Sequence, residues 1–161
     1  MYVPYENMPM NARVWVYASP SIMNPDQVAK ARVRLYDFCE EWKAHGQELQ
    51  ASFSILYDRF LILLVNEEQA KASGCSIDSS VHVIQELAKS LDIDFFDRMQ
   101  VAFYNQENKL DGMHMSDFSD YLKTVDYPEE VVVFNTTVQD KKGLETDFEV
   151  PVKESWHKQL L

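Results

Sequence analysis

Six consecutive apolar residues, Phe60-Leu61-Ile62-Leu63-Leu64-Val65, constrain the fold of this chain more than any other segment. Successive side chains of a β-strand point to opposite faces of its sheet, so this run has no polar face for water to solvate. It is also far shorter than the roughly twenty apolar residues that cross a bilayer as a helix. The run therefore predicts a central strand that protein covers on both faces.

The neighbouring segments predict the rest of a sheet and two helices. Arg13–Tyr17 alternates β-branched and aromatic residues, and Ala51–Tyr57 has one apolar and one mostly polar face, so both predict strands. We expect the second of these to turn at Asp58-Arg59 and to pair with the central run as a hairpin. Asn24-Pro25-Asp26-Gln27 combines an N-cap, a proline at the first helical position and a capping-box partner, and so predicts a helix start. A second helix is expected to begin at or just after Cys75.

A fourth strand over Met99–Tyr104 completes the order β-α-β-β-α-β, which is the pattern of ferredoxin-like folds. A third helix capped by Ser116 and two strands, Val131–Phe134 and Phe148–Val152, follow it. The sequence thus predicts an α+β fold: a ferredoxin-like βαββαβ core with a C-terminal αββ extension that covers the sheet. The alternative is a three-layer α/β/α fold around a mixed sheet. No linker or repeat divides the chain, so residues 1–161 are expected to form a single domain.

Charge and cysteine content limit the partners and the compartment. The chain has 26 acidic and 15 basic residues, a formal charge of −11, so phosphate backbones and anionic lipids are repelled on average. We therefore expect neither nucleic acid nor a membrane as partner. Met1–Asn7 has no cationic start and no apolar stretch, and two cysteines are too few for a disulfide framework. These features predict a cytoplasmic protein with free thiols.

The segment that most resembles a reactive or ligand-binding site is Ser73-Gly74-Cys75-Ser76-Ile77-Asp78-Ser79-Ser80. Its small residues let a ligand approach the backbone, and the N–H groups at the start of the helix lower the pKa of a nearby cysteine or bind a carboxylate or phosphate. A purely structural interpretation is equally available. Ser76, Asp78 or Ser79 then caps the helix, and Cys75 packs as a small apolar residue.

Two sets of candidate site residues follow from this segment. A catalytic site would combine the thiol of Cys75 with Asp78 and a histidine base, for which His45 is favoured and His82 is the alternative. A ligand-binding site would use the polar groups of the loop together with one arginine. Its members are Ser73, Gly74, Ser76, Ser79 and Arg59.

Motifs for other chemistries are absent. The chain has no phosphate-binding glycine loop, no dinucleotide fingerprint, no nucleophile elbow and no His-Glu-x-x-His zinc motif. Asp92, Asp94 and Asp97 lack the spacing and the glycine of a calcium loop, and no Cys/His pair has zinc-ligand spacing. We expect no metal and no cofactor, and nucleotide hydrolysis is disfavoured.

Ala44-His45-Gly46, Phe60–Leu63, Ser73–Ser80 and Asp94–Arg98 together resemble a family of short bacterial proteins of unknown function. Its members are often labelled ABC transporter ATPases, a label that the missing phosphate-binding loop contradicts here. The resemblance spans most of the chain and implies a bacterial, cytoplasmic protein without an assigned reaction. Where the family places an acidic pair after the third strand, this chain has Asn66-Glu67.

The leading functional hypothesis is a non-enzymatic binding or assembly domain, because no complete catalytic constellation can be assembled. A homodimer through sheet edges or through the aromatic surface is one form that such a domain could take. The alternatives are a thiol-dependent or redox-active enzyme centred on Cys75, and a small-anion site at the same helix start. Whether the chain is an enzyme stays open at this point.

Overall fold

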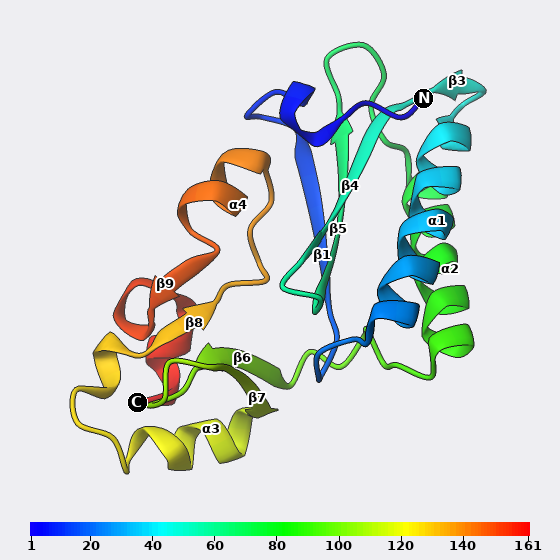
Figure 1. Ribbon diagram of the computed structural model, residues 1–161. Coiled ribbons are helices and arrows are strands. Elements are labelled where there is room, and N and C mark those ends of the chain that lie inside the picture. Colours follow the sequence, from blue (N-terminus) through cyan, green and yellow to red (C-terminus); the bar gives the residue numbers. More distant parts are fainter.

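The computed structural model describes residues 1–161 (Figure 1). The α-helices are α1 (Pro25–Glu41), α2 (Gly74–Leu91), α3 (Met115–Leu122) and α4 (Lys141–Thr146). The strands are β1 (Arg13–Ala18), β2 (Lys43–Ala44), β3 (Gln47–Glu48), β4 (Gln50–Leu56), β5 (Phe60–Asn66), β6 (Gln100–Tyr104), β7 (Leu110–His114), β8 (Val132–Phe134) and β9 (Glu149–Pro151). Short 3-10 turns lie at Tyr5–Asn7, Pro128–Glu130, Val152–Glu154 and Trp156–Leu160. The expected α+β class is confirmed.

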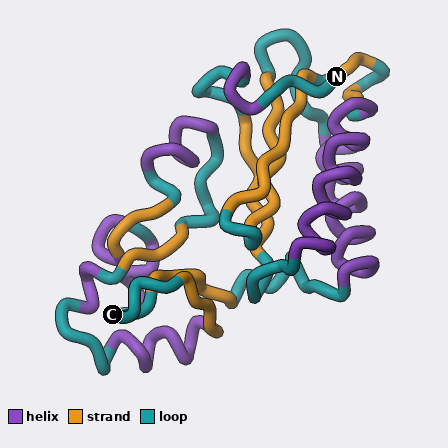
Figure 2. The backbone as a smooth tube through the Cα atoms, in the orientation of Figure 1, coloured by secondary structure: helices purple, strands orange, loops and turns teal.

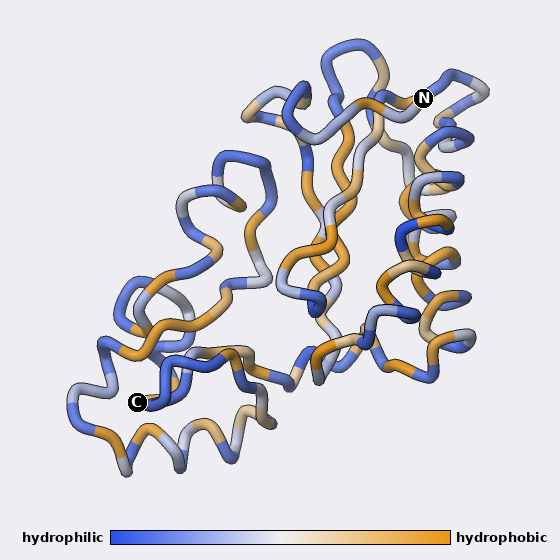
Figure 3. The backbone as a smooth tube through the Cα atoms, in the orientation of Figure 1, coloured by the Kyte–Doolittle hydropathy of each residue, from blue (hydrophilic) through white to orange (hydrophobic).

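The first sheet has the order β1-β5-β4 with antiparallel pairing throughout, and α1 and α2 cover one of its faces (Figures 1 and 2). All six residues of the apolar run in β5 are 0% exposed. Leu61, Leu63 and Val65 pack in the core that includes the buried residues of α1 and α2. Figure 3 shows orange, apolar backbone in the interior of this sheet. The prediction of a doubly covered central strand is confirmed.

The C-terminal part of the chain helps to cover the other face of this sheet. Phe60 and Ile62 point into a second core that contains Phe134, Leu144 and Phe148. The Phe60 ring lies 5.1 Å from the Phe134 ring and 5.0 Å from the Phe148 ring, measured between centroids. Such offset and edge-on aromatic contacts stabilise a core beyond the burial of their area. The far face is therefore buried under the segment around β8 and α4, as the lack of a polar face on β5 requires.

The second sheet has the order β7-β6-β8-β9 and packs against α3. A ferredoxin-like sheet would place β6 beside β1, but β6 pairs with β7 and β8 instead, so this part of the prediction is corrected. The physical reason is local: β7 follows β6 through a tight turn in which Asn105 Oδ1 accepts bonds from the N–H groups of Glu107 and Lys109. Closing this hairpin costs little loop entropy. Every pair of the strands β1 to β9 is antiparallel, and the single parallel bridge joins Tyr2 to Ala51 outside them, so these strands form no mixed sheet.

Arg59 lies where the two sheets approach each other. Its buried guanidinium donates from Nε to the carbonyl oxygen of Ser19 at 3.2 Å and from Nη2 to that of Pro20. The same group lies against Gly112 in β7, where an added Cβ would stand 2.0 Å from Nη2. Burial lowers the pKa of Arg59, and the charge of Asp111 opposes this shift. A side chain at position 112 would therefore displace the Arg59 guanidinium from its hydrogen bonds.

Gly112→Ala is expected to lower the free energy of unfolding by about 1–3 kcal/mol, the usual cost of forcing extra volume into a packed site. Urea unfolding followed by far-ultraviolet circular dichroism measures the change. Gly74→Ala is the matched control, because nothing lies within 4 Å of its added Cβ at the start of α2. Equal effects of the two substitutions would contradict the role assigned to the Arg59 contact.

Candidate functional site

The small-residue segment before α2 forms the start of that helix. Ser73 is the N-cap, and its Oγ accepts a bond from the Ser76 N–H at 3.1 Å, while Ser76 Oγ accepts one from the Ser73 N–H at 2.6 Å. Ser79 Oγ donates to the Cys75 carbonyl oxygen at 3.0 Å. Gly74 occupies the first helical position with open space around its Cα. The hydroxyl groups of this segment are therefore engaged in starting and bracing the helix.

The structure does not join the three predicted catalytic side chains by any hydrogen bond. Cys75 and Asp78 are exposed on the first turns of α2, and neither side chain has a polar partner in the protein. His45 is exposed in the tight turn between β2 and β3, where its φ angle is 50°. That hairpin does lie near the start of α2, because Trp42 Nε1 donates to the Ser76 carbonyl oxygen at 2.8 Å. The thiol has no base within hydrogen-bonding reach in this arrangement.

Arg59 lies far from the other predicted ligand-binding residues. It directly precedes β5, whereas Ser73 and Gly74 follow a loop beyond the far end of that strand. A seven-residue strand is about 20 Å long, so Arg59 and the start of α2 are at opposite ends of the sheet. No group of three or more His, Cys, Asp or Glu side chains is placed to hold a metal ion.

The free edge of β1 is a feature that the sequence reasoning missed. β1 is the end strand of its sheet, and the bond from the Val14 N–H to the Gln139 carbonyl oxygen, at 2.9 Å, shows that Val14 points its backbone away from β5. The backbone N–H and C=O groups of successive residues in an antiparallel strand point alternately toward and away from one neighbour. Those of Val16 and Ala18 therefore also point away from β5. The Val14 C=O, both Val16 groups and the Ala18 N–H have no hydrogen-bond partner in the protein.

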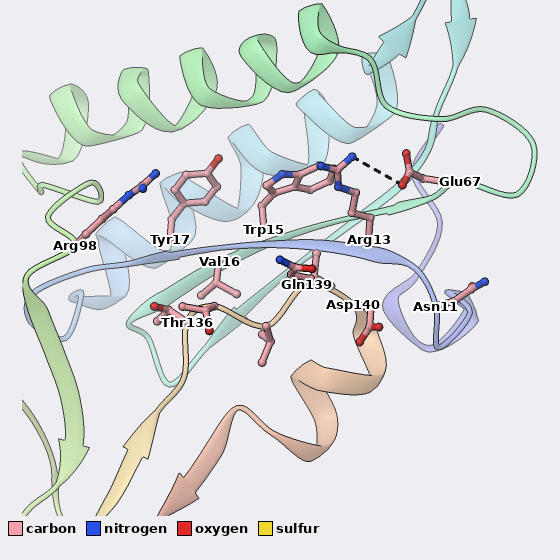
Figure 4. A pocket seen from close by; sticks show the side chains of 13 residues that line it. Asn11, Arg13, Trp15, Val16, Tyr17, Glu67, Arg98, Thr136, Gln139 and Asp140 are labelled. Atoms are coloured by element: carbon pink, nitrogen blue, oxygen red, sulfur yellow. Dashed lines mark ion pairs between the residues drawn. The ribbon is translucent and has the colours of Figure 1, made fainter. Parts of the chain in front are cut away.

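A cavity of about 750 Å³ lies along this edge (Figure 4). The cavity is closed at one end, where the Val14 N–H donates to the Gln139 carbonyl oxygen and the Lys141 N–H donates to the Ala12 carbonyl oxygen. The chain segment 136–138 has no such bonds to β1. A second cavity of about 300 Å³ shares part of its lining and continues toward Ala18. We call the two together the β1 groove. The residues that line both cavities are Val16, Tyr17, Arg98, Thr136 and Thr137.

One wall of the groove consists of Arg13, Trp15, Tyr17 and Arg98, which lie on the α2 side of β1 in Figure 4. Arg13 forms an ion pair with Glu67 at 4.0 Å, and its guanidinium carbon lies 4.8 Å from the centre of the Trp15 ring. Burial raises the pKa of Tyr17, while hydrogen bonding and the nearby positive charge of Arg98 oppose this shift. Arg98 is exposed and has no hydrogen bond or ion pair within the protein.

The opposite wall is the segment from Thr136 to Asp140. Its position is fixed by α4: Asp140 Oδ1 caps that helix by accepting from the Gly143 N–H at 2.7 Å. Lys141 is buried and donates from Nζ to the carbonyl oxygens of Tyr5 and Met8, at 3.0 and 2.8 Å. These contacts anchor the Asp140 end of the wall to α4 and to the N-terminal segment.

Trp156 lines the second cavity and stacks on His157, with ring centres 4.0 Å apart. His157 is buried, and its Nδ1 lies 2.7 Å from Ser155 Oγ. Burial lowers the pKa of His157 to about 4. A neutral imidazole therefore supports this side of the groove.

Comparisons with known proteins place the chain in no family: no family model, no curated protein and no solved structure matches it. The resemblance carried by Ser73–Ser80 accordingly remains a prediction. No helix in the structure is both long enough and apolar enough to cross a membrane.

A thiol reagent at neutral pH is expected to modify one cysteine only. Cys75 is exposed, whereas Cys39 is buried and burial raises its pKa to about 12, which suppresses its reactive thiolate. Colorimetric thiol counting in native buffer should give one reactive group, and counting in denaturant should give two. Cys75→Ser should abolish the native signal, and a fast second thiol would contradict the burial of Cys39.

Stability is expected to fall as the pH drops below 6.5, because the unfolded chain protonates His157 at its ordinary pKa of 6.5 while the folded protein keeps it neutral down to about 4. The loss attributable to this group between pH 7 and pH 5.5 is about 1 kcal/mol. Urea titrations across this range measure it. His157→Gln should flatten the slope, with the exposed His45→Gln as control, and an unchanged slope in His157→Gln would refute the assignment.

Proposed function

We propose that this protein is a non-enzymatic binding domain that accepts an extended segment of a partner protein as an additional strand beside β1. The observation that carries the proposal is the row of unpaired backbone groups on β1 along the β1 groove. Strand addition of this type obtains its affinity from main-chain hydrogen bonds and its specificity from alternate side chains. It also suits a chain whose candidate catalytic thiol has no base beside it.

The free groups have the spacing that an incoming strand needs. The Val14 C=O, the Val16 N–H, the Val16 C=O and the Ala18 N–H offer acceptors and donors in turn. The stretch from Val14 to Ala18 spans about 13 Å, so it pairs with a segment of about five residues. A cavity of about 750 Å³ is within the usual size range for ligand sites.

The walls of the groove favour a single extended chain over a second copy of this protein. The edge of β1 lies between the Trp15–Tyr17–Arg98 wall and the segment 136–140 (Figure 4). A free strand can enter between two walls, whereas the identically walled edge of another copy cannot reach the unpaired groups. We therefore assign the groove to a partner segment, and self-association becomes an outcome of the test.

In the free protein, the amides of Val16 and Ala18 are expected to exchange with solvent rapidly although both lie within a strand. Trp15 and Tyr17 donate toward β5 and are expected to be protected. Amide exchange followed by nuclear magnetic resonance compares the four residues directly. Equal protection of all four would show that the β1 edge is not free.

Val16→Pro should abolish binding of peptides selected from a random library, because proline removes the outward N–H while edge strands tolerate it. Ile55→Pro is the matched control: its N–H points away from β5 on the opposite edge of the sheet, outside the groove. Fluorescence anisotropy of the labelled peptides measures their binding to both variants. Thr137→Trp, at an exposed lining position, provides a second variant that fills the groove without changing β1.

Peptides that bind Val16→Pro and Thr137→Trp as well as the unmodified protein would overturn the proposal. So would a dimer, detected by light scattering, that Val16→Pro dissociates, because the occupant of the edge would then be a second copy. Loss of binding in Ile55→Pro alone would assign the site to the β4 edge.

A further inference from the structure

We infer that the segment bound in the β1 groove carries an Asp or Glu side chain whose carboxylate is held by Arg98. This inference rests on the proposed function and adds the chemical class of the partner. Its basis is the position of Arg98 in both cavities of the groove, together with the absence of any acidic partner for it within the protein.

Asp97, beside Arg98 in the sequence, and Arg13, at the other end of the groove, already have partners within the protein. Asp97, its neighbour in sequence, accepts from the Met99 N–H at 3.0 Å and from Gln100 Nε2 at 3.2 Å. Arg13, the other cation of the groove, is paired with Glu67. Arg98 is thus the one cationic group of the groove that is available to a ligand.

The geometry of Arg98 suits a carboxylate in a strand beside β1. Figure 4 shows its side chain next to Tyr17 on the same side of β1, and the effect of its charge on the Tyr17 hydroxyl is consistent with this closeness. Guanidinium groups bind carboxylates through two parallel N–H bonds. Between the walls of a groove such a pair is less screened by water than on an open surface, so it contributes more to affinity.

The charges at the two ends of the groove also fix where the acidic residue lies. Glu67 and Asp140 line the closed end, near Arg13, whereas Arg98 lines the cavity that continues toward Ala18. An acidic side chain at the closed end would face two carboxylates. The acidic residue of the segment therefore lies beside Ala18, and this polarity orients the bound strand.

The experiment selects binders from a random octapeptide library displayed without free termini, in which Asp, Glu, Asn and Gln are equally represented. Binding of the strongest peptide and of its Glu→Gln or Asp→Asn counterpart is then measured by fluorescence anisotropy. The proteins compared are the unmodified chain, Arg98→Gln, Arg98→Lys and Arg32→Gln. Arg32 is an exposed arginine on α1 without an ion pair, so its substitution removes the same charge away from the groove.

We expect acidic residues to be enriched at one position of the selected peptides. Arg98→Gln should lower the affinity for the acidic peptide by about tenfold or more, the usual scale for a hydrogen-bonded charge pair. The affinity for its amide counterpart should not change. Arg98→Lys should retain part of the affinity, and Arg32→Gln should retain nearly all of it. Raising the salt concentration should lower the affinity for the acidic peptide more than the affinity for the amide peptide.

The failures of the two proposals are distinguishable. A library that yields no binder contradicts strand addition itself. Binders without acidic enrichment, or an acidic peptide that binds Arg98→Gln and the unmodified protein equally, overturn the role of Arg98 while strand addition stands. Equal weakening by Arg98→Gln and Arg32→Gln would attribute the effect to net charge and would also overturn this role.

Discussion

The exclusion of water from both faces of β5 organises this protein. A strand buried on both faces must pair its backbone groups on both of its edges, because an unpaired buried N–H or C=O costs about as much as a lost hydrogen bond. β5 therefore lies between β1 and β4, and these two strands become the edges of the sheet. The helices α1 and α2 cover one face, and the segment around β8 and α4 covers the other. The position of the β1 groove follows from this arrangement.

The groove exists because the strand that would complete a ferredoxin-like sheet pairs elsewhere. β6 belongs to the second sheet, and only the short segment at Gln139 and Lys141 bonds to the first part of β1. Arg59 bonds to the carbonyl groups of Ser19 and Pro20 just after β1, and its guanidinium also lies against Gly112 of the second sheet. The closed end of the groove is fixed separately, by the backbone bonds that join Val14 to Gln139 and Ala12 to Lys141.

Local features of the sequence predicted the elements but not their partners. The capping box at Asn24 and Gln27 is present, and the central strand is doubly covered. The turn between β4 and β5 is centred on Tyr57-Asp58, one residue before the expected position. The alternation of apolar and polar residues predicts a strand but not the strand with which it pairs. The sequence therefore did not predict that β6 belongs to the second sheet. β7 was also missed, because Asp111-Gly112 is a weak strand signal.

The segment around Cys75 shows a related limit. Serine and glycine at a helix start serve equally for capping and for binding an anion, and only the observed bonds between Ser73 and Ser76 show how they are used. An exposed sheet edge, meanwhile, is a liability in most proteins, because unpaired strands of different molecules join into aggregates. Here the unpaired part of β1 lies in a groove, between the wall that contains Trp15, Tyr17 and Arg98 and the segment 136–140. Under the proposed function, the same walls would also restrict edge-to-edge contact between copies of the protein, so one feature would serve both for binding and against aggregation.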